Sequence, residues 1–452
     1  MNLIRAFRVQ SGDLVSFVGG GGKTTTMFRM ASDLVAQGHR VVTTTTTQIS
    51  AQQMALSPHH ITYEQGQDAD RLIRLLGEQL AVHPHILVVG PSDHDTDRAC
   101  GVDADVVEAV AAMPQVDCVL NEADGARMRP FKAPAEHEPV VPSRTTLLVP
   151  VVGIEVIGRP LTDEHVYRAA VASRLAGVAL GASVTPEIVA AVLTDFQGGL
   201  KGLPIGARVM PFINKVESGT LALAHSLAEH LLAHQEVESV VIGSVQDHNP
   251  VREVWSRVAA VVLAAGASSR FGALKQMLPW QGGTLLSHVV DTALESRADP
   301  VIVVLGNRAE ECGAALDGRP VRIVNNEDWA EGQSTSVKAG LAAVPDNVRS
   351  ALFALADQPM VTAHTIDALI ARYRSTLAPV VWPEHGGERG NPVLFDRALF
   401  PDLMRLSQDA GGRSVLEAHV ADAERVSVDD PGILFDIDTP VDYQESKGPP
   451  KR

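Results

Sequence analysis

Two stretches of the sequence combine glycines and cations in the spacing that phosphate binding needs. In the first, SFVGGGGKTTTM (residues 16–27), four glycines precede Lys23 and Thr24. Glycines let backbone amides wrap phosphate oxygens without a side-chain clash, and a helix that begins there adds positive potential. Lys23 can reach the β- and γ-phosphates of a nucleotide, and Thr24 can ligate magnesium. We therefore predict nucleotide contacts from Gly19, Gly22, Lys23 and Thr24; the alternative is a tight turn with a surface lysine.

Two acidic residues could complete this first site. Glu122 and Asp124 follow the apolar run CVL within CVLNEADG, at the end of an expected strand. A carboxylate at such a strand end is where a nucleotide-binding protein holds magnesium or its water. We predict that Glu122 and Asp124 assist Thr24 in metal binding; the alternative is an acidic turn.

A third stretch near this domain's end could contact a base. PFINKVES places Asn214, Lys215 and Glu217 after a strand-like run. It resembles the N-K-x-D motif by which some GTPases read their base, with Glu in place of Asp. The exchange leaves the identity of the base open, and the same stretch is equally compatible with a plain strand-to-helix turn that contacts no base.

The second phosphate-binding stretch is VVLAAGASSRFGALKQMLPW (residues 261–280). Small residues where the strand ends would let a nucleotide lie against the main chain. Lys275 follows at the reach expected for the α- and β-phosphates, and Arg270 lies within the loop. Both cations can offset charge that builds on a leaving pyrophosphate. The predicted nucleotide contacts are Leu263, Ala264, Ala265, Gly266 and Ser268.

Carboxylates downstream of this loop could bind magnesium. Asp357 ends the apolar strand in ALFALADQPM, and Asp436 and Asp438 lie in LFDIDTPVDY. A carboxylate at such a strand end can ligate a magnesium ion that bridges a triphosphate. We predict that Asp357 binds the metal together with Asp438 or Asp436. For Asp438 the alternative is a helix N-cap before Thr439.

Further polar residues stand beside these motifs. NNEDWAEGQSTSVKAGL carries Gly332, Ser334 and Ser336 and resembles the G-x-x-x-S-V-x-x-G-L stretch of cytidylyltransferases. Serine hydroxyls at a helix start suit an anion or a ribose, or they simply cap the helix. ERGNPVLF and DAGGRSVL, with Asn391 and Arg413, are glycine-bearing loops suited to the mouth of a substrate site.

Strand-like apolar runs that alternate with helical patterns must position these motifs. They predict an α/β protein with parallel sheets in both halves. The pattern resets near residues 247–257, where the strand VAAVVLAAG begins. We predict two domains, residues 1–250 and 257–445, and a frayed tail, QESKGPPKR.

Composition excludes several classes of protein. The 452 residues carry a net charge of −16, which argues against a general nucleic-acid binder. No apolar run is long enough for a membrane helix, and the N-terminus lacks an export signal. Cys100, Cys118 and Cys312 are widely spaced, which predicts buried thiols in a reducing cytoplasm.

The motifs of each half resemble a known family. GGGGKTT, VVTTTTT, EADGARMRPFKAPAEHEPVVP and VVGIEVIGRPLTDEHVYR resemble the YqeC-like accessory proteins of selenium-dependent molybdenum hydroxylases, over residues 10–247. The LAAG loop with its lysine, the GQSTSVKAGL stretch and DIDTP resemble the MobA-like nucleotidyltransferases, over residues 257–445. The resemblances imply a P-loop-NTPase-like domain followed by a Rossmann-like nucleotidyltransferase domain.

The second resemblance also implies a reaction. LAAG, where guanylyltransferases more often have LAGG, favours the molybdenum cofactor cytidylyltransferases. They transfer CMP from CTP to molybdopterin with Mg²⁺, and Asn391 and Arg413 would then face the pterin. The first domain would bind a second NTP and help to deliver the cofactor to a molybdenum hydroxylase. The alternatives are a nucleotide-switched delivery protein, a sugar-1-phosphate nucleotidyltransferase and a guanylyltransferase.

Overall fold

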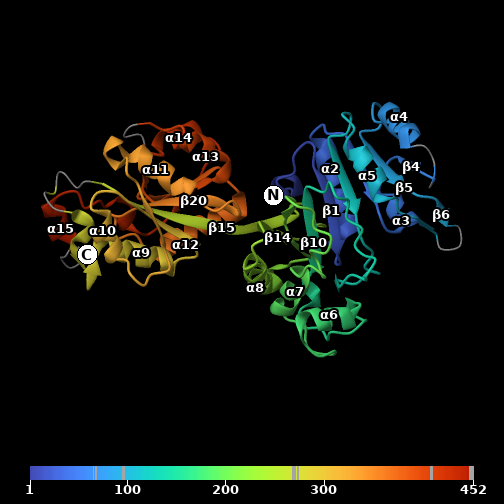
Figure 1. The fold of residues 1–452 in the computed structure, drawn as a ribbon, viewed down its shortest axis with the longest axis horizontal. Helices are drawn as coiled ribbons and strands as arrows, with labels where there is room; N and C mark the ends of the chain where they lie inside the picture. Colours follow the sequence, from blue (N-terminus) through green and yellow to red (C-terminus); the bar gives the residue numbers. More distant parts are fainter. Residues whose placement is uncertain are drawn as a thin grey trace. The chain divides into compact units, whose positions relative to one another are not determined.

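The chain divides into two compact units, Met1–Trp255 and Ser256–Arg452 (Figure 1). The computed structural model describes residues 1–64, 66, 69–93, 97–266, 271, 274–407 and 411–446. Of the predicted site residues, Ser268 and Arg270 lie outside the described part. The last six residues of the expected frayed tail also lie outside it.

A parallel sheet forms the centre of the first unit. Every neighbouring pair in it is parallel. The strands stand in the order β4 (His60–Thr62), β5 (His85–Val89), β2 (Val41–Thr45), β8 (Cys118–Glu122), β1 (Leu14–Gly19), β10 (Leu147–Gly153), β13 (Phe212–Asn214) and β14 (Ser239–Gly243). The short strand β12 (Arg208–Val209) also pairs with β10.

Helices connect these strands, as parallel pairing requires. They are α1 (Leu3–Phe7), α2 (Lys23–Ala36), α3 (Ala51–Met54), α4 (Ala69–Gln79), α5 (Ala104–Ala111), α6 (Ala169–Ala176), α7 (Pro186–Leu193) and α8 (Leu221–Leu232). Short pairs of strands lie outside the main sheet: β9 (Phe131–Lys132) with β11 (Val166–Tyr167), and β7 (Arg98–Ala99) with β3 (Ile49–Ser50) and β6 (Ser92–Asp93).

The glycine-rich turn between β1 and α2 follows from close backbone packing. Gly19 and Gly21 have φ angles of 92° and 78°, which side chains rarely adopt. A Cβ atom on Gly19 would lie 2.4 Å from the Val151 carbonyl oxygen, and one on Gly21 would lie 2.1 Å from the Gly153 nitrogen. The turn therefore needs glycine because it presses against the end of β10.

The second unit has a mixed sheet, which corrects the prediction of a parallel one. Its strands stand in the order β19 (Arg322–Asn325), β18 (Val301–Leu305), β15 (Val251–Ala264), β20 (Val348–Leu355), β23 (Val393–Asp396), β21 (Val380–His385) and β24 (Glu424–Ser427). β23 is antiparallel to β20 and β21. The segment between β21 and β23 contains only the short strand β22 (Glu388–Arg389), too little for the crossover that a parallel strand needs.

Helices pack along this second sheet. They are α9 (Leu285–Glu295), α10 (Ala309–Ala314), α11 (Gln333–Ala342), α12 (Ala363–Thr376), α13 (Phe400–Leu403), α14 (Arg413–Ala418) and α15 (Pro440–Ser446). A hairpin of β16 (Pro279–Trp280) and β17 (Gly283–Thr284) precedes α9. Buried side chains of β15, β18, β20, β23 and α11 form a core of their own.

Three local expectations are wrong. β15 begins at Val251 rather than at Val258, because Val254 and Trp255 are buried and extend the strand through the expected linker. Cys118 and Cys312 are buried as expected, but Cys100 is exposed. Residues 444–446 of the expected tail belong to α15.

Candidate functional site

Lys275 lies at the centre of the polar groups of the second unit. It begins a short 3-10 helix, Lys275–Met277. Its Nζ atom donates to Asp357 Oδ2 at 2.5 Å and to Asp438 Oδ1 at 3.2 Å. Asp357 follows the carboxyl end of β20. The Asp357 carbonyl accepts a hydrogen bond from the Ile437 amide at 2.9 Å, and this bond brings the neighbouring Asp438 close to Lys275. The structure thus brings together Lys275, Asp357 and Asp438 from three distant parts of the chain.

The electrostatics of this cluster favour a bound cation or phosphate. Burial alone would lower the pKa of Lys275, but the carboxylates of Asp357 and Asp438 raise it, so the lysine stays charged. Partial burial and the negative charges of Asp357 and Asp438 raise the pKa of Asp436. Among the residues that the structure describes, Asp357 Oδ1 is buried and has no hydrogen-bond partner. An unsatisfied carboxylate oxygen beside crowded negative charge is compatible with a metal ligand.

The two candidates for the second carboxylate differ in their surroundings. Asp438 contacts Lys275, whereas Asp436 is hydrogen-bonded to Gln358. Asp438 is not the helix cap, because the Thr439 hydroxyl accepts from the Asp442 amide at the start of α15. Within the described residues, no group of three or more His, Cys, Asp or Glu side chains is arranged to hold a metal ion. A metal here would therefore depend on two carboxylates and on substrate oxygens.

A buried glutamine that the sequence analysis missed fixes the end of β15. Gln276 is 3% exposed, and its Nε2 atom donates to the carbonyls of Ala264 at 3.3 Å and Gly266 at 3.0 Å. It joins the LAAG strand end, residues 263–266, to the helix that carries Lys275. Its position directly after the predicted lysine was the only signal that could have found it.

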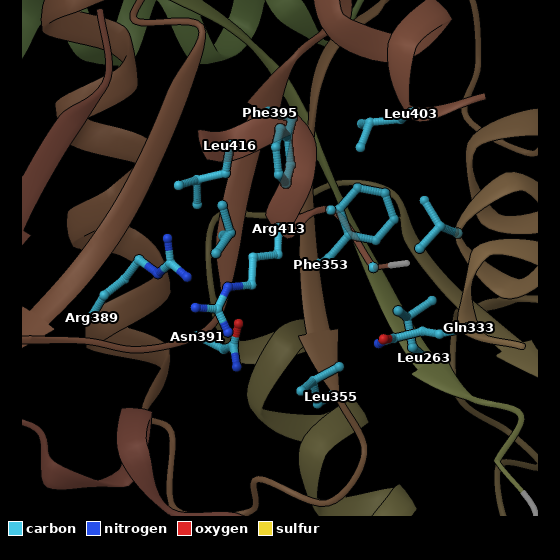
Figure 2. Close-up of a pocket in the computed structure, with 14 residues that line it drawn as sticks. Leu263, Gln333, Phe353, Leu355, Arg389, Asn391, Phe395, Leu403, Arg413 and Leu416 are labelled. Carbon is cyan, nitrogen blue, oxygen red and sulfur yellow. The ribbon is translucent and has the colours of Figure 1, made fainter. Parts of the chain in front are cut away.

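A cavity of about 210 Å³ lies beside this strand end. Its apolar wall includes Leu263, Phe353 and Phe395. Figure 2 shows Arg389, Asn391 and Arg413 gathered on one side of it. Three predicted residues, Leu263, Asn391 and Arg413, thus line one cavity. The sequence analysis did not single out Arg389.

The arginines give this cavity a positively charged mouth. Arg413 is largely exposed, and its Nε atom donates to Glu417 at 2.9 Å, a pair that solvent screens. Arg389 is exposed at the end of β22. The arrangement suits an aromatic or apolar ring that carries an anionic group.

The predicted serines are placed differently. Ser334 and Ser336 are buried in α11, and Ser336 accepts from Asn326 Nδ2 at 3.0 Å. Gly332, with a φ of 120°, occupies the N-cap position, so neither serine caps the helix. Neither is among the residues that line the cavity, where α11 contributes Gln333 and Val337 instead.

In the first unit the structure assembles the residues predicted around Lys23. Lys23 is 3% exposed, and its Nζ atom lies 3.2 Å from Asp124 Oδ1 and 3.6 Å from Glu122 Oε1. Thr24 Oγ1 donates to Glu122 Oε2 at 2.6 Å. Burial would lower the pKa of Lys23, but the two carboxylates raise it; burial raises the pKa of Glu122.

The glycine loop is held by contacts within the protein. Lys23 Nζ donates to the Gly19 carbonyl at 2.6 Å, and the Gly20 and Gly21 amides donate to the carbonyls of Val151 and Arg129. The amides at the start of α2, by contrast, have no partner within their own helix. A phosphate at this loop would therefore contact the first turn of α2 and draw Lys23 away from Gly19.

A buried ion-pair chain extends from this loop and was not predicted from the sequence. Lys132, fully buried, lies between Asp124 Oδ2 at 3.0 Å and Glu138 Oε2 at 2.7 Å. Arg168 pairs with the same Glu138 oxygen at 2.6 Å and lies over the Tyr167 ring. Despite partial burial, these two cations lower the pKa of Glu138 to about 2.

Two protein-family models match separate parts of the chain. Residues 260–423 match the model of the MobA-like NTP transferase domain, and residues 15–170 match that of the YqeC protein. The described part of the chain contains no helix that is long and apolar enough to cross a membrane.

Three curated relatives each match about half of the chain or less. The uncharacterized protein YqeC of Escherichia coli is 29% identical over 52% of this chain and 88% of its own length. The nicotine blue oxidoreductase of Paenarthrobacter nicotinovorans is 34% identical, and the match covers 40% of this chain and 92% of the relative. The molybdenum cofactor cytidylyltransferase of Escherichia coli is 31% identical, and the match covers 42% of this chain and 96% of the relative.

A solved nucleotidyl transferase from Methanothermobacter is 26% identical, covers 42% of this chain and 95% of its own, and has a TM-score of 0.38. The family assignment rests on the sequence matches alone. Because two of these relatives are at least 30% identical and are covered nearly end to end, the chain belongs to the MobA-like NTP transferase family through its C-terminal half, while residues 15–170 match the YqeC family model.

Proposed function

We propose that the second unit transfers CMP from CTP to molybdopterin that carries molybdenum. A phosphate oxygen of the pterin attacks the α-phosphorus of CTP, the bond to the β-phosphate breaks, and pyrophosphate leaves. Because the attacking phosphate is already anionic, the reaction needs no strong general base. The observation that carries the proposal is Lys275, held between Asp357 and Asp438 beside the LAAG strand end.

The residues of the site have separate roles in this proposal. Residues 263–266 and Gln276 give the triphosphate a fixed backbone edge. Lys275 stabilises negative charge on the α- and β-phosphates, a kind of preorganised contact that dominates many enzymes. Arg270 and Ser268, which lie outside the described residues, are proposed to act on the same phosphates.

Asp357 and Asp438 would hold a magnesium ion, which when bound neutralises the triphosphate and aligns it for displacement. We assign Asp438 rather than Asp436 as the second carboxylate because it meets Asp357 at the Lys275 ammonium.

The adjacent cavity is proposed to hold the pterin. Phe353 and Phe395 offer an apolar wall for the ring system, and Arg389, Asn391 and Arg413 offer donors for its phosphate. Gly332, Ser334 and Ser336 then support the site from α11 rather than contact the cofactor.

The first unit is proposed to be a companion nucleotide site. Gly19, Gly22 and Lys23 would bind the phosphates of a second NTP, and Thr24, Glu122 and Asp124 would hold its magnesium. Its purpose would be to help load or deliver the finished cofactor to a molybdenum hydroxylase.

A pyrophosphate-release assay over the four NTPs, with and without molybdopterin, tests the main proposal. CTP-dependent release only with molybdopterin is the expected result. Release with a sugar 1-phosphate or with GTP would assign another transferase. Absence of release with tight cofactor binding would favour a delivery protein. Reduction of nicotine blue without release would place the chain with its oxidoreductase relative.

A further inference from the structure

The turn after β13 remains without a role in the proposed reaction. We propose that this turn, residues 214–217, selects guanine at the companion nucleotide site. The inference rests on the nucleotide site proposed above for the first unit, and it adds the identity of the base. It would make that site a GTP site, distinct from the CTP site of the second unit.

The strand order indicates on which side of β1 a base would lie. Lys23 and Thr24 contact Glu122 and Asp124, which follow β8 on one side of β1. The terminal phosphates and their metal therefore belong on the β8 side. On the other side of β1 stand β10, β13 and β14, all parallel. The carboxyl ends of these strands are left for the nucleoside, as is usual for ligands of parallel α/β sheets.

Asn214 ties this region to the glycine loop. It is 1% exposed, and its Nδ2 atom donates to the Gly21 carbonyl at 2.8 Å. Its Oδ1 atom accepts from the amides of Lys215 at 2.8 Å and Val245 at 3.0 Å. One side chain thus joins the phosphate loop, the turn after β13 and the segment after β14. A base held by the turn would have a fixed position relative to the phosphates.

The turn itself is rigid and presents two charged side chains outward. Val216 is fully buried, its amide donates to the Gly243 carbonyl, and its own carbonyl accepts from Arg252 Nε at 3.0 Å. Lys215 and Glu217, on either side, are exposed, and Glu217 forms a capping box with Thr220 at the start of the 3-10 helix Ser218–Thr220. Because the backbone is fixed at Val216, both outward side chains start from defined positions.

Lys215 has an unusual backbone conformation for a residue with a side chain. Its φ angle is 61°, in the left-handed region, a strain that often marks functional sites. Its ammonium pairs with Glu155, which follows β10. Its aliphatic stem therefore extends from the end of β13 toward the end of β10, where it can cover one face of a base.

The carboxylate of Glu217 decides which base fits. An ionised carboxylate only accepts hydrogen bonds, and its two oxygens can take two neighbouring donors. Guanine is the one common base whose pairing edge carries two adjacent donors, N1–H and the N2 amino group. Adenine and cytosine each place an acceptor next to their amino group, so one carboxylate oxygen would face a lone pair. Glu217 thus favours guanine and opposes the other bases.

Equilibrium binding of ribose-labelled GTP and ATP to the full chain tests the inference. Binding that disappears in Lys23→Ala identifies the N-terminal component, because the second unit keeps its own nucleotide site. We expect this component to favour GTP over ATP by about tenfold or more. Glu217→Ala should weaken GTP binding by about 10- to 100-fold, the scale of charged hydrogen bonds, with little change for ATP. Glu236→Ala, an exposed acid before β14, is the matched control and should leave both unchanged.

Glu217→Gln adds a specific reversal. The amide offers a donor as well as an acceptor, so it should favour XTP, which carries a carbonyl where guanine carries the N2 amino group. Equal binding of ATP and GTP with no effect of either Glu217 variant would overturn the base assignment and leave the nucleotide site standing. Absence of any Lys23-dependent binding would overturn the companion site as well.

Discussion

At the scale of single residues, the chemistry centres on lysines held by carboxylates. Lys275 and Lys23 each lie within 4 Å of two acidic side chains, and each retains its charge because those acids offset burial. A lysine so placed can exchange a carboxylate for a phosphate oxygen without a change of protonation. The first two predictions test this role in the second unit.

Lys275→Ala should lower CTP-dependent turnover by about 10²-fold or more, the scale of one preorganised charge contact. The fold should persist, because the side chain is partly exposed and contributes little packing. Pyrophosphate release and a thermal unfolding scan measure the two effects. Full activity in a folded Lys275→Ala protein would remove Lys275 from the mechanism.

Asp357→Asn and Asp438→Asn should each raise the magnesium concentration for half-maximal turnover by about tenfold or more, because one of two anionic ligands becomes neutral. Glu445→Gln, an exposed acid in α15, provides the control for a change of charge. Magnesium titrations of all three variants make the comparison. Wild-type curves for both aspartate variants would exclude the proposed metal site.

At the scale of elements, close packing and buried polar groups set the stability. α11 packs on β15 and β18 through Gly340: a Cβ atom there would lie 2.5 Å from Val261 Cγ1 and 3.1 Å from Val304 Cγ2. β5 buries His85, whose Nε2 atom lies 3.0 Å from the Thr43 hydroxyl. Each feature gives a prediction about unfolding.

Gly340→Ala should destabilise the second unit by about 1–3 kcal/mol, because the clash with two buried valines outweighs the gain in helix propensity. Gly313→Ala in α10 is the matched control. Its Cβ would meet Leu305 Cδ1 at 3.8 Å, an ordinary contact, so stability should hold or rise slightly. Urea unfolding measures the free energy of unfolding of both variants. Equal values for Gly340→Ala and Gly313→Ala would contradict the packing argument.

The first unit should lose stability as the pH falls from 6.5 to 4. Burial lowers the pKa of His85 to about 4, whereas an unfolded histidine has a pKa of 6.5. In this window the unfolded chain binds a proton at His85 that the folded chain does not bind. The contribution of His85 to the free energy of unfolding is therefore complete above pH 6.5 and decreases as the pH falls below that value. When this contribution of His85 is lost completely, the free energy of unfolding falls by about 3 kcal/mol.

His85→Gln should flatten this dependence, because an amide does not titrate and can still reach Thr43. The exposed His248→Gln should keep the wild-type slope. Unfolding free energies between pH 4 and 7 give the comparison. An unchanged slope in His85→Gln would show that other groups control the acid sensitivity.

At the scale of the whole molecule, two units with separate sheets and cores each carry a glycine turn and acidic partners. Lys23→Ala should therefore abolish nucleotide binding by the first unit and leave CMP transfer by the second intact. Activation of a cofactor-free molybdenum hydroxylase, which we expect to need both units, should fail. Parallel assays of pyrophosphate release and hydroxylase activation separate these effects. Loss of pyrophosphate release in a folded Lys23→Ala protein would show that both glycine turns serve one reaction.

The sequence by itself determined the features that depend on neighbouring residues. Four glycines between an apolar run and a helical pattern predicted the β1–α2 turn, and the LAAG stretch marked the end of β15. Lys275 and Asp357 were singled out because residue type and strand-end position are local properties. The family matches rest on the same local patterns.

Only the tertiary structure decided which distant groups meet. Lys275 pairs with Asp438 across 163 positions, and Asn214 holds Gly21 across 193. Strand order sets such contacts, and local pattern does not encode strand order. The antiparallel pairing of β23 and the burial of Lys132 between Asp124 and Glu138 were missed for the same reason: each depends on partners brought together by the sheet.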